Sequence, residues 1–233
     1  MCTNYLKTQF ENNIRVMERK DFDETIKMIS DNMYGLWLQN LKDCFRQNIK
    51  AQNILLAVTT GLMILLDGDI CTFIFIIFAQ ESSLALAYML KFYIGIENEL
   101  KDLRHIGVPS KKYIKFWILD GIINNQKQIV ASVALTTTCD KDYDSTQTVE
   151  LKRLSVTPNL RRMKIGSKML EHALQKATEM GFQRMVLYCS DRQPPAIELY
   201  KRYGFKTFKI IDKTMFSVLS GWTDYLVSGT NKE

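Results

Sequence analysis

The sequence predicts an α/β domain, with a mixed central sheet flanked by helices, that is interrupted by an apolar helical hairpin. Outside positions 51–95, apolar residues alternate as in strands or recur every three or four residues as in helices. Positions 51–95 are instead almost continuously apolar. The 233 residues suffice for one folded domain with such an insertion. We therefore expect 1–50 to supply the first strand and helices plus an interfacial lead-in, 51–95 the insertion, and 96–233 the rest of the domain.

Before and just after the insertion, the pattern predicts one strand, two helices and a meander of two strands. A short strand is expected at Ile14–Met17, and a helix capped by Asp21 or Asp23 follows it. After the insertion, Glu97–Ile106 is predicted to be a short helix. The next two strands, expected to join through Asn124 and Asn125, are Phe116–Leu119 and Ile129–Leu135.

The last third of the chain alternates strands and helices. A strand at Thr148–Val156 precedes an amphipathic helix at Ile165–Met180, which Gly181 terminates. A strand at Met185–Tyr188 then leads to a helix at Ala196–Tyr203, started by two prolines. The closing strands are expected at Phe205–Lys209, Thr214–Leu219 and Trp222–Val227.

The insertion has the composition of a membrane hairpin. Asn53–Leu66 carries no charge, and Asp67–Asp69 forms a polar turn. Ile70–Ala79 resumes the apolar run, and within it Phe73–Phe78 is apolar on every face. Gln80–Ser83 is a second polar break before Leu84–Leu90. We expect a helical hairpin in the bilayer, either spanning or re-entrant. The alternative is a pair of buried helices in the core of a soluble protein.

The charges that flank the insertion predict its orientation. Lys42, Arg46 and Lys50 precede it and Lys91 and Lys101 follow it, whereas its turn holds only acids. The positive-inside rule then places both ends, and the globular domain, on the cytosolic side.

Composition excludes several other classes of protein. The polar first residues argue against a cleavable signal peptide. Five scattered cysteines and two histidines give no disulfide framework and no metal site. Between Val149 and Lys209 there are thirteen basic and five acidic residues, which fits either an anionic partner or a solvated basic face. No motif typical of nucleic-acid binding accompanies this basic block, so nucleic acid is disfavoured.

One segment has the pattern of an anion cradle. The strand through Leu154, Ser155 and Val156 ends at a proline turn and enters a helix through Arg161–Ser167. Free backbone N–H groups at a helix start bind anions, and Gly166 allows a diphosphate to approach the backbone closely. Taken alone, the segment also fits an ordinary strand–turn–helix.

A second segment, Ala196–Phe205, lies about thirty residues downstream. Together the two segments resemble the GNAT superfamily of acetyl-CoA-dependent N-acetyltransferases. The hairpin between the first helix and the second strand narrows this resemblance to the membrane-bound branch of the endoplasmic reticulum that includes the cysteine-S-conjugate and aspartate N-acetyltransferases. The sequence departs from the family at Lys164, where a glycine is usual, and at Tyr188, where several relatives carry an acid.

The resemblance implies acetyl transfer from acetyl-CoA to an amine. A backbone N–H at Val156 would polarise the thioester carbonyl. Tyr200 falls on the family position that protonates the departing thiolate, and Glu150 is the candidate base, although it also fits a solvated carboxylate at a sheet edge. The residues expected to hold the cofactor are Leu154, Ser155, Val156, Arg161, Arg162, Met163, Lys164, Ile165, Gly166, Ser167 and Gln193.

Several alternatives stay open at this point. Cys189 fits a covalent relay less well than an inert thiol, because no histidine neighbours it in sequence. The acceptor is an amine of a small molecule, such as an amino acid or cysteine conjugate, or a lysine. A different class of function is a catalytically inactive, membrane-tethered binding or scaffold protein on a degenerate GNAT fold.

Overall fold

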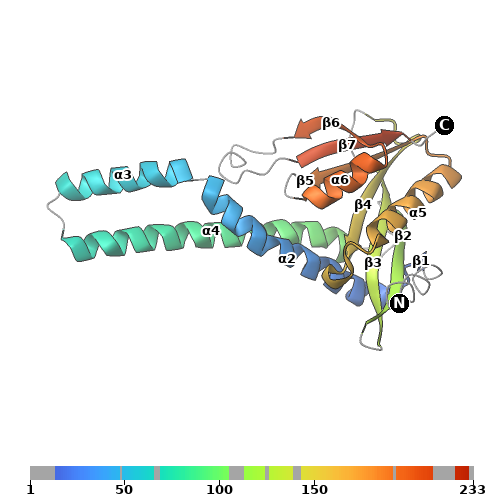
Figure 1. The fold of residues 1–233 in the computed structure, drawn as a ribbon, viewed down its shortest axis with the longest axis horizontal. Coiled ribbons are helices and arrows are strands. Elements are labelled where there is room, and N and C mark those ends of the chain that lie inside the picture. Colours follow the sequence, from blue (N-terminus) through green and yellow to red (C-terminus); the bar gives the residue numbers. More distant parts are fainter. Residues whose placement is uncertain are drawn as a thin grey trace.

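The computed structural model describes residues 14–47, 49–65, 69–104, 113–123, 126–138, 143–190, 193–211 and 224–230. These residues form a seven-stranded sheet in the order β1-β2-β3-β4-β5-β7-β6 (Figure 1). Only β4 and β5 are parallel, and all other neighbours are antiparallel. The strands are β1 Ile14–Val16, β2 Tyr113–Ile123, β3 Gln126–Thr137, β4 Thr148–Val156, β5 Arg184–Ser190, β6 Lys206–Ile211 and β7 Asp224–Thr230.

Helices cover both faces of the sheet. Helix α5 (Ile165–Glu179) and helix α6 (Pro194–Arg202) pack on one face, where the main core cluster includes Met169, Leu170 and Leu119. Helix α2 (Phe22–Gln47) packs its first turns on the other face, where Met28 and Ile29 meet apolar residues of β2 and β3. The sheet is therefore buried on both sides, which explains the long apolar runs of its central strands.

Most predicted elements are confirmed. Strand β4 has the predicted bounds, and α5, β5 and α6 differ from the expectation by at most two residues at either end. Strands β2 and β3 are longer than predicted. The predicted strand at Thr214–Leu219 and the turn at Asn124 and Asn125 lie outside the described residues.

One expectation about the insertion is wrong. Glu97–Ile106 is not a separate short helix, because α4 runs without interruption from Ile70 to Arg104 and its last turns include the residues up to Arg104. The polar residues Gln80–Ser83 lie inside this helix. Thr59 of the preceding helix donates a hydrogen bond to Gln80 Oε1 at 3.1 Å.

Helix α3 (Ile49–Leu65) and α4 form a hairpin that projects away from the sheet (Figure 1). Asp69 starts α4, since its carboxylate accepts hydrogen bonds from the Thr72 backbone N–H at 2.9 Å and from the Thr72 hydroxyl at 2.6 Å. Ile70–Ala87 is long and apolar enough to cross a membrane, and none of it is buried in the protein; the apolar part of α3, Leu56–Leu65, is shorter.

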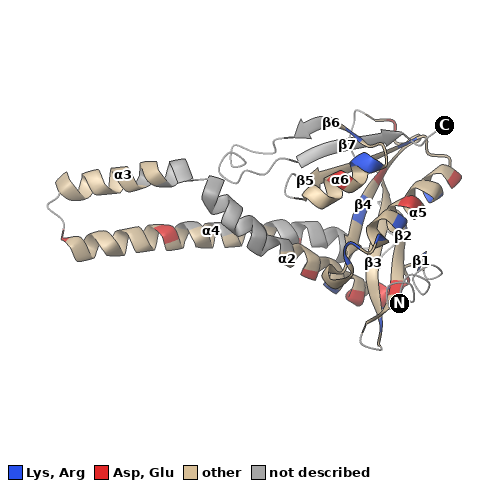
Figure 2. Cartoon of the chain, in the orientation of Figure 1, with Lys and Arg blue, Asp and Glu red and all other residues tan. Residues whose placement is uncertain are grey.

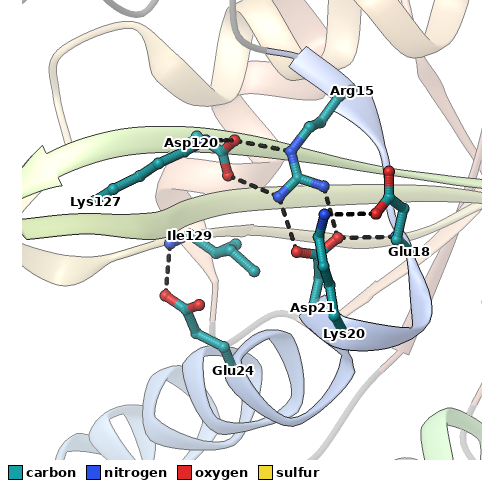
Figure 3. A network of polar contacts seen from close by, with 8 residues as sticks. All are labelled: Arg15, Glu18, Lys20, Asp21, Glu24, Asp120, Lys127 and Ile129. Atoms are coloured by element: carbon teal, nitrogen blue, oxygen red, sulfur yellow. Dashed lines mark hydrogen bonds and ion pairs between the residues drawn. The ribbon is translucent and has the colours of Figure 1, made fainter.

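An ionic network fixes the start of α2 to the sheet (Figure 3). The Arg15 guanidinium on β1 binds Asp21 at 2.6 Å and Asp120 of β2 at 2.8 Å, and Lys127 of β3 binds Asp120 at 3.0 Å. The hydrogen bond from Arg15 lowers the pKa of Asp21 to about 2. Glu24 accepts the backbone N–H of Ile129 at 2.8 Å, where a β-bulge interrupts the β2–β3 register.

Candidate active site

The two parallel strands part at the carboxyl end of β4. The β4–β5 register ends at the Leu151–Leu187 pair, whereas β4 continues beside β3 to Val156. Thr157 donates its backbone N–H to the Val130 carbonyl at 2.9 Å, so Val156 and Ala131 form a non-hydrogen-bonded pair. The N–H and C=O of Val156 therefore point away from β3, into the opening between β4 and β5.

A β-bulge shapes this end of β4. Two residues, Arg153 and Leu154, oppose the single residue Val133 of β3, and Arg153 has a left-handed backbone with φ 57°. The bulge shifts the alternation of side chains, so that Leu154 and Val156 pack against the cluster under α5 and α6. Ser155 lies on the other face, where it meets α2.

The loop after β4 presents backbone donors. After the short helix η2 (Pro158–Leu160), Arg162 and Lys164 adopt left-handed conformations with φ 64° and 62°. Lys164 precedes α5 and no side chain caps that helix, so its first N–H groups have no intrahelical acceptor. A left-handed residue before a helix start forms a nest that binds anions. Lys164 thus adopts the positive φ that the usual glycine would take.

Backbone strain is concentrated at the end of β4 and in the β4–α5 loop. Among the described residues, the only non-glycine positions with positive φ are Arg153, Arg162 and Lys164. Each costs about 1–2 kcal/mol relative to a right-handed conformation. Strained, basic residues that gather at one strand end and one loop are typical of a binding site.

Gly166 lies between the parted strand and α6. A Cβ built on it would stand 3.6 Å from Leu199 Cδ2 and 3.8 Å from Val156 Cγ2. These are ordinary van der Waals distances, so the protein itself tolerates a small side chain there. Any requirement for glycine at this position must come from a ligand.

Basic residues gather at the end of β4 and in the β4–α5 loop, whereas α5 carries both basic and acidic residues (Figure 2). Arg161, Arg162 and Lys164 are exposed and adjoin the uncapped helix start. The uncapped donors, the nest and these cations fit a diphosphate.

Tyr200, Cys189 and Gln193 come together beside the opening. Tyr200 is 7% exposed and its ring lies 5.7 Å from that of Phe205, centroid to centroid. Burial, and to a smaller extent the nearby Cys189, raises the pKa of Tyr200 far above its usual value, so its hydroxyl stays protonated. The Cys189 thiol donates to Gln193 Oε1 at 3.8 Å.

The structure corrects one expectation for Glu150. It is not a solvated carboxylate at a sheet edge: β4 is a central strand, and Glu150 is 2% exposed. Its carboxylate pairs with Lys152 Nζ at 3.1 Å. Because Val149 and Leu151 face α5, Glu150 lies on the α2 side of the sheet, opposite the face that holds Tyr200.

Sequence reasoning missed Asn32 on α2. Its side chain is buried and touches both Ser155 and Arg161, which are 123 and 129 residues away in the chain. No local pattern marks such a residue, because its partners are remote in sequence. An asparagine among the apolar positions of an amphipathic helix was the one available signal.

These features define an α/β domain that can hold an anionic ligand in the opening between two parallel strands. Residues 96–205 match the Acetyltransferase (GNAT) family, and this chain therefore carries a GNAT acetyltransferase domain. In that family acetyl-CoA is the co-substrate.

Curated relatives agree with this assignment. The chain is 38% identical over 92 residues to "Probable N-acetyltransferase 14" of Xenopus tropicalis, covering 40% of this chain and 41% of that protein. It is 34% identical over 97 residues to "N-acetyltransferase family 8 member 3" of Rattus norvegicus, covering 42% and 40%. The match therefore spans about two fifths of the length of each relative.

A solved structure of a GNAT-family acetyltransferase from Desulfovibrio desulfuricans aligns with 57% of this chain and 78% of its own, at 15% identity and a TM-score of 0.45.

Proposed function

We propose that this protein is a membrane-anchored N-acetyltransferase that moves an acetyl group from acetyl-CoA to an amine. The observation that carries the proposal is the set of strained basic residues at the bulge of β4 and in the β4–α5 loop, beside the opening between β4 and β5. Strain of this kind persists only where the surrounding structure enforces it.

Backbone groups would do most of the binding. The N–H groups of Lys164–Ser167 and the side chains of Arg161 and Arg162 would hold the diphosphate. The Val156 N–H, which points into the opening, would donate to the thioester carbonyl and stabilise the negative charge that develops on its oxygen. Leu154, Ser155, Met163, Ile165 and Gln193 would complete the walls of this binding site.

Two side chains would move protons. Tyr200 would donate its phenolic proton to the departing thiolate, a role that suits a hydroxyl kept protonated by burial. Glu150 would accept the proton of the attacking amine, directly or through water, from the α2 side of the sheet. Its partner Lys152 supplies the opposite charge that a buried carboxylate requires.

The hairpin would anchor the enzyme, with its domain facing the cytosol. Support comes from the exposed apolar surface of α3 and α4 and from the basic residues at their open end. The endoplasmic reticulum and an amino acid, a cysteine conjugate or a lysine as acceptor follow from the resemblance to the membrane-bound branch. We propose 1–50, 51–95 and 96–233 as the corresponding segments.

The inactive-scaffold alternative rests on Lys164 and on the missing acid at Tyr188. Lys164 adopts a positive φ, so its replacement of glycine does not prevent the loop from forming. An acid at the end of β5 is not required if Glu150 is the base.

Calorimetry of CoA binding to the detergent-solubilised full-length protein tests the proposal. Gly166→Glu adds bulk and a repelling charge beside the diphosphate, and binding should become undetectable. Gly166→Ala is the matched variant, since its Cβ meets only Leu199 and Val156 at ordinary distances. It should fold normally and bind CoA more weakly. Absence of CoA binding by the wild-type protein would contradict the proposal, as would equal affinity in a folded Gly166→Glu.

A screen of acetyl transfer from radiolabelled acetyl-CoA to several amine classes then separates the enzyme from the scaffold. Binding of CoA without transfer to any amine would favour the scaffold.

A further inference from the structure

Asn32 occupies an unusual place for a polar side chain. It is 5% exposed on the face of α2 that packs against the sheet, next to Met28 and Ile29. A buried amide is costly unless its donors and acceptor are satisfied. Asn32 donates from Nδ2 to Met28 Sδ at 3.5 Å within α2, and its other two partners belong to the proposed cofactor site.

Each end of the amide group contacts a different residue of that site. Its Nδ2 donates to Ser155 Oγ at 2.6 Å, on the bulged end of β4. Its Oδ1 accepts from Arg161 Nη2 at 3.2 Å, in the loop that precedes α5. The same amide therefore touches the strand that faces the thioester and the loop that faces the diphosphate.

Arg161 is held at a second point. Its Nε donates to the Val156 carbonyl at 3.4 Å, the carbonyl that points into the opening. A guanidinium has five N–H donors in a rigid plane. Two are used by Val156 and Asn32, so the orientation of the plane is fixed and three donors remain, including both on Nη1.

We propose that Asn32 is a positioning residue that orients Arg161 for the diphosphate of acetyl-CoA. This inference rests on the proposed function. Asn32 itself does not touch the cofactor; it removes the freedom of a long side chain before the ligand arrives. Ordering a flexible side chain costs binding free energy, and prior orientation avoids that cost.

The inference has a mechanical corollary. Asn32 lies on the helix that continues toward the membrane hairpin (Figure 1). The anchor and the cofactor loop are therefore joined by one side chain, in addition to the connection through the sheet.

The test compares two acetyl donors on the full-length protein in detergent. Asn32→Ala should raise the KM for acetyl-CoA about 2- to 10-fold, the scale expected when one long side chain must be ordered on binding. The KM for the amine should not change. With acetyl-pantetheine, which lacks the diphosphate, wild type and Asn32→Ala should give equal kcat/KM.

Two further variants serve as a conservative replacement and a matched control. Asn32→Asp retains an oxygen for Arg161 and should recover most of the acetyl-CoA affinity. Thr25→Ala is the matched control, because Thr25 is a buried polar residue of α2 whose hydroxyl has no partner among the described residues. It should leave both KM values unchanged.

The outcomes separate the two levels of proposal. An equal defect with acetyl-CoA and acetyl-pantetheine would mean that Asn32 supports β4 and not Arg161, and would overturn the inference. An acetyl-CoA KM unchanged in Asn32→Ala would overturn it as well. If the wild-type protein binds no CoA, the proposed function fails first.

Discussion

The hairpin and the sheet domain use the same apolar residue types in opposite ways. In the sheet, Ile118, Leu119 and Val133 are completely buried, and α2, α5 and α6 cover them. In the hairpin, Phe75 and Phe78 are 70% and 72% exposed, and the other described large apolar side chains between Ile54 and Ile94 are mostly exposed too. The first region is covered by its own chain, whereas no other described part of the chain covers the second.

The two regions therefore differ in the source of their stability. Burial of apolar surface stabilises by roughly 25 cal/mol per Å². The sheet gains this by folding, while the exposed surface of the hairpin would gain it from the lipid contact that we propose. Exposed apolar patches on this scale mark interaction surfaces. Changes in the hairpin should therefore alter where the protein resides, and changes in the domain should alter what it binds and how stably it folds.

The largest effect should come from charging the hairpin. The triple variant Ile74→Lys, Phe75→Lys and Phe78→Lys should move the protein from the carbonate-resistant pellet to the soluble fraction. Each lysine costs about 2.5–3.5 kcal/mol in the centre of a bilayer. The domain should remain folded and keep its CoA affinity, because these side chains are exposed.

A matched variant carries leucine at the same three positions and should stay in the pellet. Extraction of the wild-type protein by carbonate would contradict membrane anchoring. Glycosylation acceptors placed in the Asp67–Asp69 turn distinguish a spanning hairpin, which exposes the turn to the lumen, from a re-entrant one.

The second effect tests the domain. Tyr200→Phe should reduce kcat about 10²- to 10⁴-fold, the usual contribution of acid catalysis, while CoA affinity is unchanged. The ring remains and its packing on Phe205 is preserved. Tyr203→Phe is the control on the same turn of chain, since the Tyr203 hydroxyl bonds to Glu171 instead of facing the opening. Wild-type turnover in Tyr200→Phe would leave Tyr200 with a packing role alone.

A third, smaller effect concerns loop strain. Lys164→Gly should raise the free energy of unfolding by about 1 kcal/mol, because glycine adopts a φ of 62° without penalty. Lys168→Gly, inside α5, should lower it by about the same amount. Thermal unfolding in detergent measures both. CoA affinity in Lys164→Gly is the second readout: a decrease would show that the ammonium contacts phosphate, and an unchanged value would assign binding to the backbone.

The smallest effect is a pH dependence in the core. Burial lowers the pKa of His172, and Lys176 lowers it further while Glu179 opposes this. The folded protein then binds fewer protons than the unfolded chain near pH 6, so stability should fall as the pH decreases through the unfolded value of about 6.5. His172→Phe, which keeps an aromatic ring against Trp117, should lose less stability between pH 7.5 and 5.5. An equal loss of stability in both proteins between pH 7.5 and 5.5 would exclude His172 as the source of the pH dependence.

Local patterns predicted what depends on local physics. The bounds of β4 follow from its alternation and the proline turn after it, and α5 begins where the amphipathic period begins. The separate helix expected from Glu97 is instead the end of α4, because the change from apolar to polar residues does not end the helix. The burial of Glu150 depends on the order of strands in the sheet, and the role of Asn32 depends on two segments more than 120 residues away. Contacts between residues far apart in the chain produce no periodic pattern in the sequence.

The uninterrupted course of α4 has a consequence for which acceptors can react. If Leu90 marks the membrane surface, the fourteen residues to Arg104 form a rod of about 20 Å without a hinge. A rod holds the catalytic opening at a fixed height and tilt above the bilayer, whereas a flexible tether would let it sample a volume. Amines confined to the same membrane would meet it at a high effective concentration, provided that their reactive group stands at that height. The length of the helix would then determine which acceptors can reach the site, according to the height of their amine above the membrane.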